Sequence, residues 1–172
     1  MSRLRRPYLS GRYFFVTCNL LRTRERLSNF DFEILARLVS SRREAHGFLL
    51  TAWVFLPDHW HAIFGPRAPA TISEAMESIK VSSTRQINAR RRELGRLWQG
   101  RFFDRALRTV KEYEETVEYI HWNPVRRGLV ARPEDWEWSS YTEYALPEEN
   151  LLPHPDLRID RVRLPANERM RI

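Results

Sequence analysis

Two histidines separated by one residue, His59 and His61, are candidate metal ligands. They begin a run, His59 to Gly65, whose alternating pattern predicts a strand. Successive side chains of a strand point to opposite faces, so both imidazoles share one face and Trp60 takes the other. Two such imidazoles can chelate a divalent ion and leave coordination positions open. The alternative is a chance His-x-His pair, and the tripeptide alone does not decide between the two.

Tyr119 and Asn123 form a second candidate pair, four residues apart at the end of a predicted helix. Residues with this spacing share one helix face. Asn123 offers an amide oxygen to a hard cation, and the Tyr119 hydroxyl is a potential nucleophile toward phosphorus. The alternative is a core tyrosine and a helix-terminal asparagine, which the spacing does not exclude. His121, two residues from Tyr119, is expected to point elsewhere, toward the surface or toward a bound nucleic acid.

Seven elements are expected to position these side chains, in the order strand, helix, strand, strand, helix, strand, helix. Their ranges are 12–20, 29–46, 48–56, 59–65, 71–92, 97–108 and 112–122. Asn29 is the expected N-cap of the first helix, and Thr71 and Glu74 predict a capping box for the second. Pro124 is expected to end the third near Asn123, with a short extended segment following. The order predicts an α+β, ferredoxin-like antiparallel sheet with helices packed mainly on one face.

The chain has 172 residues, a length that suits one domain. We expect a core domain over 12–145, a basic N-terminal arm over 1–11 and a partly disordered C-terminal tail over 146–172. No apolar run is long enough for a membrane span, and the N-terminus lacks the pattern of a signal peptide. Cys18 is the only cysteine, which excludes an internal disulfide and cysteine-rich zinc sites. A cytoplasmic protein without a membrane partner is therefore expected.

Cationic residues predict a nucleic-acid partner. The net charge is +7, and Lys80 and Lys111 are the only lysines among 29 cationic residues. Guanidinium groups bind phosphate oxygens in pairs and stack on bases. The cations are also clustered, because Arg85 to Arg108 contains eight arginines, whereas Glu112 to Glu118 contains four carboxylates and no cation. Such segregation creates a local positive field that attracts phosphates.

Arginines flank aromatic side chains between Leu97 and Arg108, the mixture that binds single strands through base stacking and phosphate pairing. The candidate DNA contacts in this segment are Trp98, Arg101, Arg105 and Arg108. Further candidates are Arg5 and Arg6 in the N-terminal arm, and Lys80 and Arg85 on the second helix. The alternative, with Phe102 and Phe103 in the core beside a solvated arginine face, remains open.

Four motifs follow one another along the chain: PDHWH at 57–61, LWQG at 97–100 with FDR at 103–105, YIHWNPVRRGLV at 119–130, and WSSY at 138–141. Through them the chain from Arg12 to Tyr141 resembles the REP-associated tyrosine transposases, which belong to the single-tyrosine HUH transposases of insertion-sequence type. Trp60 and Trp122 depart from the family pattern, because smaller apolar residues are usual there.

The resemblance implies that 12–145 is a catalytic domain with a ferredoxin-like palm. It implies Mg²⁺ or Mn²⁺ held by His59 and His61, with Asn123 as the third ligand and Tyr119 as the nucleophile. The implied substrate is single-stranded DNA at REP-type hairpins, nicked and rejoined through a 5′-phosphotyrosine with release of a 3′-hydroxyl, as in DNA transposition and recombination. No small-molecule substrate is implied, and both a monomer and a homodimer remain open.

Two other functions fit parts of the sequence. A non-catalytic nucleic-acid-binding module of ferredoxin-like fold would bind RNA through exposed aromatic side chains and would not need the tyrosine and histidines. A metal-dependent phosphodiesterase that activates water would keep the histidines but would tolerate Tyr119→Phe.

Overall fold

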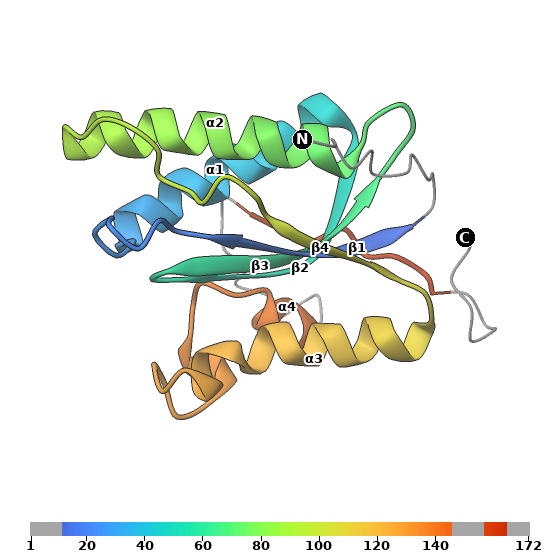
Figure 1. Cartoon of the computed structure of the whole chain (residues 1–172). Helices are drawn as coiled ribbons and strands as arrows, with labels where there is room; N and C mark the ends of the chain where they lie inside the picture. The colour runs from blue at the N-terminus through green and yellow to red at the C-terminus, as the bar shows by residue number, and fades with distance from the viewer. Residues whose placement is uncertain (1–11, 146–156, 165–172) are drawn as a thin grey trace.

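An antiparallel sheet of four strands lies at the centre of the computed structural model, which describes residues 12–145 and 157–164 (Figure 1). The strand order is β2-β3-β1-β4, and all three pairings are antiparallel. The strands are β1 (Tyr13–Asn19), β2 (Phe48–Leu56), β3 (His59–Pro66) and β4 (Phe103–Leu107). With the connections β1-α1-β2 and β3-α2-β4, this is the expected ferredoxin-like α+β fold.

Helices cover both faces of the sheet (Figure 1). Two of the three long helices share one face, and the third lies on the opposite face with a short helix beside it. They are α1 (Asn29–His46) and α2 (Ile72–Arg91) on the first face, and α3 (Val110–Arg126) and α4 (Tyr141–Ala145) on the second. The expectation of helices mainly on one face thus holds for α1 and α2 but misses the layer formed by α3. In the described residues, no helix is long and apolar enough to span a bilayer.

The central strand β1 is apolar on both sides, which explains the two helical layers. Phe14, Val16 and Cys18 belong to the core beneath α1 and α2. Phe15 belongs to a second core with Val117 and other residues of α3. Because side chains alternate along a strand, the face that carries Phe15 also carries Thr17 and Asn19. These two residues lie at the end of the sheet where α3 terminates.

The helix boundaries agree with the sequence in part. The N-cap of α1 is Ser28 rather than Asn29, because the Asp31 carboxylate accepts a hydrogen bond of 2.7 Å from the Ser28 backbone N–H. Gly47 ends α1 in the left-handed conformation, with φ of 65°. The capping box of α2 forms as predicted, since Thr71 and Glu74 bond reciprocally.

The expected end of α3 near Asn123 is wrong, since the helix continues through Pro124 to Arg126. Proline removes one backbone donor, and here the missing bond falls in the last turn, where few helical bonds follow. The backbone N–H of Arg127 still bonds the Asn123 carbonyl at 3.0 Å, and Leu129 bonds Pro124 at 2.9 Å. The segment after Pro124 is therefore a helix end and turn, not the extended stretch expected from the sequence.

Part of the C-terminal segment packs on the domain. Leu157 is fully buried, and Asp160 pairs with the free edge of β2. The Asp160 backbone N–H donates to the Leu50 carbonyl at 2.7 Å, and its carboxylate accepts from the Leu50 N–H at 2.9 Å. Residues 157–164 thus cover the outer edge of β2 around Leu50, while 146–156 and 165–172 lie outside the described residues.

Candidate functional site

The imidazoles of His59 and His61 meet edge to edge at the surface of β3. Their Nε2 atoms are 3.1 Å apart, and the side chain of Trp60 is buried on the other side of the sheet. The strand register places His61 opposite Thr17 and His59 opposite Asn19 on β1. The two rings therefore share one face, as the alternation of the strand predicts, and both lie on the α3 side.

The Nδ1 atom of each ring contacts a neighbouring polar side chain, so that Nε2 faces the cleft. His61 Nδ1 is 2.8 Å from Thr17 Oγ1, and His59 Nδ1 is 2.6 Å from the Asp58 carboxylate. Asp58 in turn accepts hydrogen bonds of 3.0 and 3.2 Å from Arg127. Partners of this kind fix the tautomer and orientation of a metal-binding histidine.

Electrostatics keep both rings neutral at neutral pH. Burial, together with the neighbouring His59, lowers the pKa of His61 to about 3. Burial also lowers the pKa of His59, although the Asp58 carboxylate opposes the shift. Burial of Asp58 would raise its pKa, but the bonds from His59 and Arg127 outweigh burial and hold the pKa below its usual value. Neutral imidazole is the form that binds a metal ion.

Asn123 adds a buried oxygen without a partner. Its side chain is 4% exposed, and within the described residues its Oδ1 accepts no hydrogen bond. A buried carbonyl oxygen left unpaired is costly, so this atom is a free lone-pair donor that a bound cation or a water molecule would satisfy. In residues 12–145 and 157–164, no group of three or more His, Cys, Asp or Glu could hold a metal. Two imidazoles and this amide oxygen nevertheless form a donor set that fits a divalent cation with open coordination positions.

Tyr119 stands beside the histidines in the same cleft. Its ring is 39% exposed and packs edge-on against His61 and Phe15, with ring centroids 5.4 and 5.8 Å away. The Arg126 guanidinium lies over the ring, 5.3 Å from its centroid. The cleft has a volume of about 470 Å³, and its lining includes both histidines, Tyr119, Asn123, Phe103, Arg126 and Arg127. The two candidate pairs, far apart in the sequence, thus form one site.

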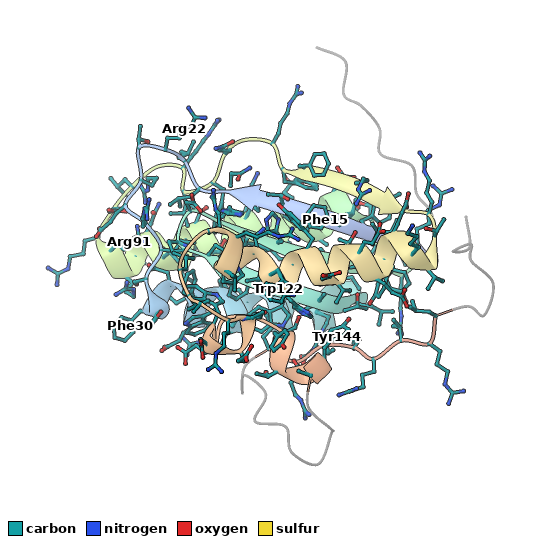
Figure 2. All side chains as sticks on the ribbon, turned by 90° about the horizontal axis from the view of Figure 1, so that it is seen from below. Phe15, Arg22, Phe30, Arg91, Trp122 and Tyr144 are labelled. Atoms are coloured by element: carbon teal, nitrogen blue, oxygen red, sulfur yellow. The ribbon has the colours of Figure 1, made fainter. Side chains whose placement is uncertain are left out.

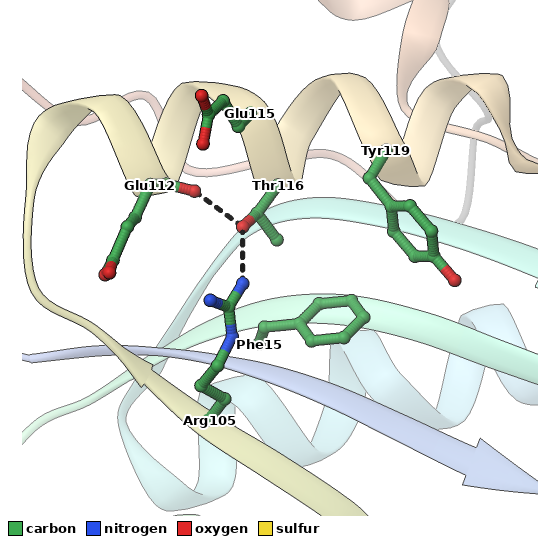
Figure 3. A pocket seen from close by; sticks show the side chains of 6 residues that line it. All are labelled: Phe15, Arg105, Glu112, Glu115, Thr116 and Tyr119. Atoms are coloured by element: carbon green, nitrogen blue, oxygen red, sulfur yellow. Dashed lines mark hydrogen bonds between the residues drawn. The ribbon is translucent and has the colours of Figure 1, made fainter.

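A smaller cavity of about 250 Å³ adjoins the cleft on the other side of Tyr119 (Figure 3). Phe15 and Tyr119 line both spaces. In this cavity the Arg105 guanidinium donates to Thr116 Oγ1 at 3.3 Å, and Thr116 donates to the Glu112 carbonyl at 2.6 Å. Among the predicted DNA contacts in the described residues, Arg105 is thus the one that shares a cavity with the tyrosine.

The other predicted DNA contacts divide into exposed and structural residues. Trp98 is 3% exposed and its indole N–H donates to Ser83 Oγ at 2.8 Å, which contradicts a role in stacking on bases. Lys80 bonds the carbonyls of Gln99 and Gly100 at 2.8 and 2.9 Å, so it holds the loop before β4. The exposed members are Arg85, Arg101 and Arg108, whereas Arg5 and Arg6 lie outside the described residues.

His121 is not at the surface, contrary to expectation. It lies on the face of α3 that meets α4, where its Nε2 is 2.9 Å from Ser140 Oγ. Burial lowers the pKa of its imidazole to about 4. The residue is thus a neutral core histidine, separated from the cleft by the helix itself.

Several cleft residues were not identified from the sequence. Asp58 directly precedes His59, and Arg127 follows Asn123 by four residues, so their spacing from residues that were identified was an available signal. Thr17 had no such signal, because only the pairing of β1 with β3 brings it to His61. The alternative that placed Phe102 and Phe103 in the core is wrong for Phe103, which is 54% exposed beside Phe15, but Phe102 is partly buried and packs against the core.

Comparison with known proteins identifies the family. Residues 10–123 match the family model described as "Transposase IS200 like". A REP-associated tyrosine transposase of Escherichia coli K12 is 33% identical over 142 residues, which cover 82% of this chain and 83% of the relative. A Haemophilus influenzae relative with the corresponding family name is 28% identical over 173 residues, covering 92% of this chain and 98% of the relative.

A solved structure agrees with both sequence relatives. It contains a REP-associated tyrosine transposase bound to a REP hairpin, and the two chains cover each other completely with 31% identity and a TM-score of 0.75. The chain therefore belongs to the IS200-like transposase family, as one of its REP-associated tyrosine transposases.

Proposed function

We propose that this transposase nicks and rejoins single-stranded DNA at REP-type hairpins, with Tyr119 as the nucleophile. The observation that carries the proposal is the contact between the Tyr119 ring and His61, whose Nε2 atom also faces that of His59. A non-catalytic binding module would need neither a tyrosine beside two oriented imidazoles nor a buried amide oxygen without a partner.

The proposed metal ligands are His59, His61 and Asn123, with Mg²⁺ or Mn²⁺ as the ion. A divalent cation at this position would supply charge compensation, lowering the repulsion between the phenolate and the phosphodiester and stabilising the leaving oxygen. Thr17 and Asp58 orient the two imidazoles through their Nδ1 atoms.

The proposed reaction is a displacement at phosphorus. The Tyr119 oxygen forms a bond to phosphorus as its proton passes to solvent, and the bond from phosphorus to the 3′-oxygen breaks. The upstream strand leaves, and its oxygen takes up a proton to become a 3′-hydroxyl, while the downstream strand remains on the protein as a 5′-phosphotyrosine. Since one phosphate ester replaces another, the reverse attack by a 3′-hydroxyl rejoins DNA without an external energy source.

The substrate assignment rests on charge and on exposed rings. Arg105 and Arg126 provide cations on either side of Tyr119, and Phe103 presents an exposed ring at the rim of the cleft. This combination binds single strands by phosphate pairing and base stacking. The hairpin seen with the solved relative supports a structured DNA partner. We place this activity in the cytoplasm, where the single buried thiol of Cys18 stays reduced.

The decisive experiment looks for the covalent intermediate. The protein is incubated with Mg²⁺ or Mn²⁺ and 3′-labelled hairpin oligonucleotides from the DNA around its own gene, then separated on a denaturing gel. We expect a protein–DNA adduct with the wild type, none with Tyr119→Phe, and an undiminished adduct with the matched control Tyr141→Phe. Cleavage by Tyr119→Phe would instead support a water-using phosphodiesterase, and a wild type that binds DNA without cleaving it would support a binding module.

A further inference from the structure

The catalytic cleft continues along β1 into a second cavity. Phe15, Thr17 and Asn19 lie on one side of the strand and line the cleft in succession. Asn19 also lines a polar cavity of about 480 Å³ that opens at the loop after β1. This second cavity, which we term the loop cavity, is bordered by Arg22, Arg24, Arg26, Asp58 and Gln99. Asn19 is the one residue that lines both spaces, and Asp58 at the loop cavity bonds His59 and Arg127 at the cleft, so the two spaces adjoin and form one groove.

The three arginines of the loop cavity differ in their partners. Arg24 is committed to the structure, because its guanidinium bonds the Asn88 side chain and the Leu94 carbonyl and pairs with Glu93. Arg22 and Arg26 are exposed, and within the described residues neither guanidinium makes a hydrogen bond or an ion pair. Figure 2 shows Arg22 beyond the end of β1, at the end of the molecule where α3 terminates. Two cations at the groove are therefore available to an anion.

The loop that carries these two arginines is held in place by the fold. Arg91 of α2 donates to the carbonyls of Glu25 and Arg26 at 3.0 and 2.9 Å. Arg91 is itself anchored by a 2.7 Å ion pair with Asp31, which is fully buried. The loop is also held by a hydrogen bond of 2.8 Å from the Leu27 N–H to the Pro57 carbonyl. Because the backbone of the loop is already ordered, anion binding by its arginines does not carry the entropy cost of ordering the loop.

We propose that Arg22 and Arg26 form a phosphate-binding subsite for the DNA segment upstream of the scissile phosphate, the segment that leaves with the 3′-hydroxyl. The subsite is distinct from the contacts predicted around Arg105, which lie on the opposite side of Tyr119. The assignment of the upstream segment rests on the proposed function, because it depends on the direction of attack by Tyr119.

The direction follows from the order of residues along the groove. Tyr119 contacts Phe15 and His61, whereas Asn19 lies further along β1, opposite His59. The tyrosine thus approaches a phosphate at the histidines from the Phe15 end. In an in-line displacement the leaving oxygen lies opposite the attacking oxygen. The 3′-oxygen and the strand attached to it therefore point toward Asn19 and the loop cavity.

The subsite gives the rejoining step a physical basis. After cleavage the downstream segment is covalently held, but the upstream segment is bound only by noncovalent contacts. Phosphate contacts at Arg22 and Arg26 keep its 3′-hydroxyl beside the phosphotyrosine, where the reverse attack takes place. Loss of these contacts releases the upstream segment earlier and favours nicked over rejoined product.

The first test measures binding without cleavage, so it does not depend on the tyrosine chemistry. In a Tyr119→Phe background, a fluorescent oligothymidylate is titrated at several salt concentrations. Arg22→Ala/Arg26→Ala is expected to weaken binding by about 2- to 5-fold per arginine and to reduce the log–log salt slope by about 1.4, or 0.7 for each contact. Arg37→Ala/Arg67→Ala removes the same charge at exposed positions outside the groove and is the matched control. Equal slopes for the two double variants would overturn the subsite.

The second test assigns the segment. The hairpin that forms the adduct is synthesised with neutral methylphosphonate linkages at the two phosphates upstream of the scissile position, or at the two downstream. Neutral linkages upstream are expected to weaken DNA binding by the wild-type protein. They are expected to cause no further loss with Arg22→Ala/Arg26→Ala, which already lacks the two cations. Downstream neutralisation is expected to weaken both proteins by the same factor. The opposite pattern would overturn the upstream assignment, whereas absence of an adduct in the wild type would overturn the proposed function and leave the first test to decide the subsite.

Discussion

The hydrogen bond between Thr17 and His61 allows a sharp prediction about metal affinity. Thr17→Val keeps the shape and β-branching of the side chain but removes the oxygen that lies 2.8 Å from His61 Nδ1. The His61 ring is 3% exposed, so water does not readily replace the lost partner. The ring then keeps its backbone contact with Val16, but its tautomer and orientation as a ligand are held less firmly.

Removal of such a partner typically weakens metal binding by about 10- to 100-fold, or about 1.4 to 2.7 kcal/mol. We expect this loss for Thr17→Val when Mn²⁺ binding is measured by isothermal titration and by the electron paramagnetic resonance signal of free Mn²⁺. Thr17→Ser, which retains the hydroxyl, is the matched control and should bind nearly as the wild type does.

A stability measurement separates this effect from misfolding. Valine suits a strand at least as well as threonine, so the thermal unfolding of Thr17→Val without metal should stay close to that of the wild type. Unchanged Mn²⁺ affinity in a folded Thr17→Val protein would refute the argument that Thr17 orients His61. Equal losses for Thr17→Val and Thr17→Ser would show that packing, not the hydroxyl, is responsible.

Three further predictions follow from the site and its surroundings. His61→Ala should abolish both adduct formation and Mn²⁺ binding in a folded protein, and EDTA should do the same to the wild type until Mg²⁺ or Mn²⁺ is restored. Asn123→Ala should have a milder effect, because water can replace one neutral ligand. Adduct formation in excess EDTA would contradict the metal site. Burial alone would raise the pKa of Asp31, but hydrogen bonds from an α2 guanidinium and the N-cap serine outweigh burial and lower the pKa below its usual value. Its contribution to stability is therefore present above the unfolded-state pKa, near 4, and is lost as pH falls through the lower folded-state value, so chemical denaturation of Asp31→Asn should show a flatter pH dependence there than the wild type. Arg105→Ala should reduce the salt slope of single-strand binding by about 0.7, whereas Trp98→Phe should lower the unfolding temperature and leave the slope unchanged; a changed slope for Trp98→Phe would restore it as a DNA contact.

The sequence alone determined the local arrangement of the candidate site. Alternation along a strand set both histidines on one face, and the four-residue spacing on a helix set Tyr119 and Asn123 side by side. Both predictions rest on backbone periodicity, which is a property of a single element and needs no knowledge of its neighbours. The element order likewise limited the fold to an α+β sheet, because strand and helix periods differ.

Predictions of whether a side chain is buried between two elements or exposed to DNA were less secure. Trp98 and His121 have residue types that suit DNA contacts, yet both are buried, because their faces meet Ser83 on α2 and Ser140 before α4. The end of α3, expected near Asn123, was likewise misplaced, because the helix continues through Pro124 to Arg126. An aromatic or imidazole ring suits a core and a binding surface equally well in the sequence, and packing of distant elements makes the choice.

Only the tertiary structure decided how the separate pairs become one site. Thr17 and His61 are 44 residues apart, and their hydrogen bond exists because β1 pairs with β3 in one register. The loop arginines Arg22 and Arg26 reach the same groove because Arg91 holds their loop against α2. Strand register and loop placement depend on how the whole core packs, since a shift of one residue would exchange the two faces of a strand. That information is spread over the chain, so no local pattern in the sequence contains it.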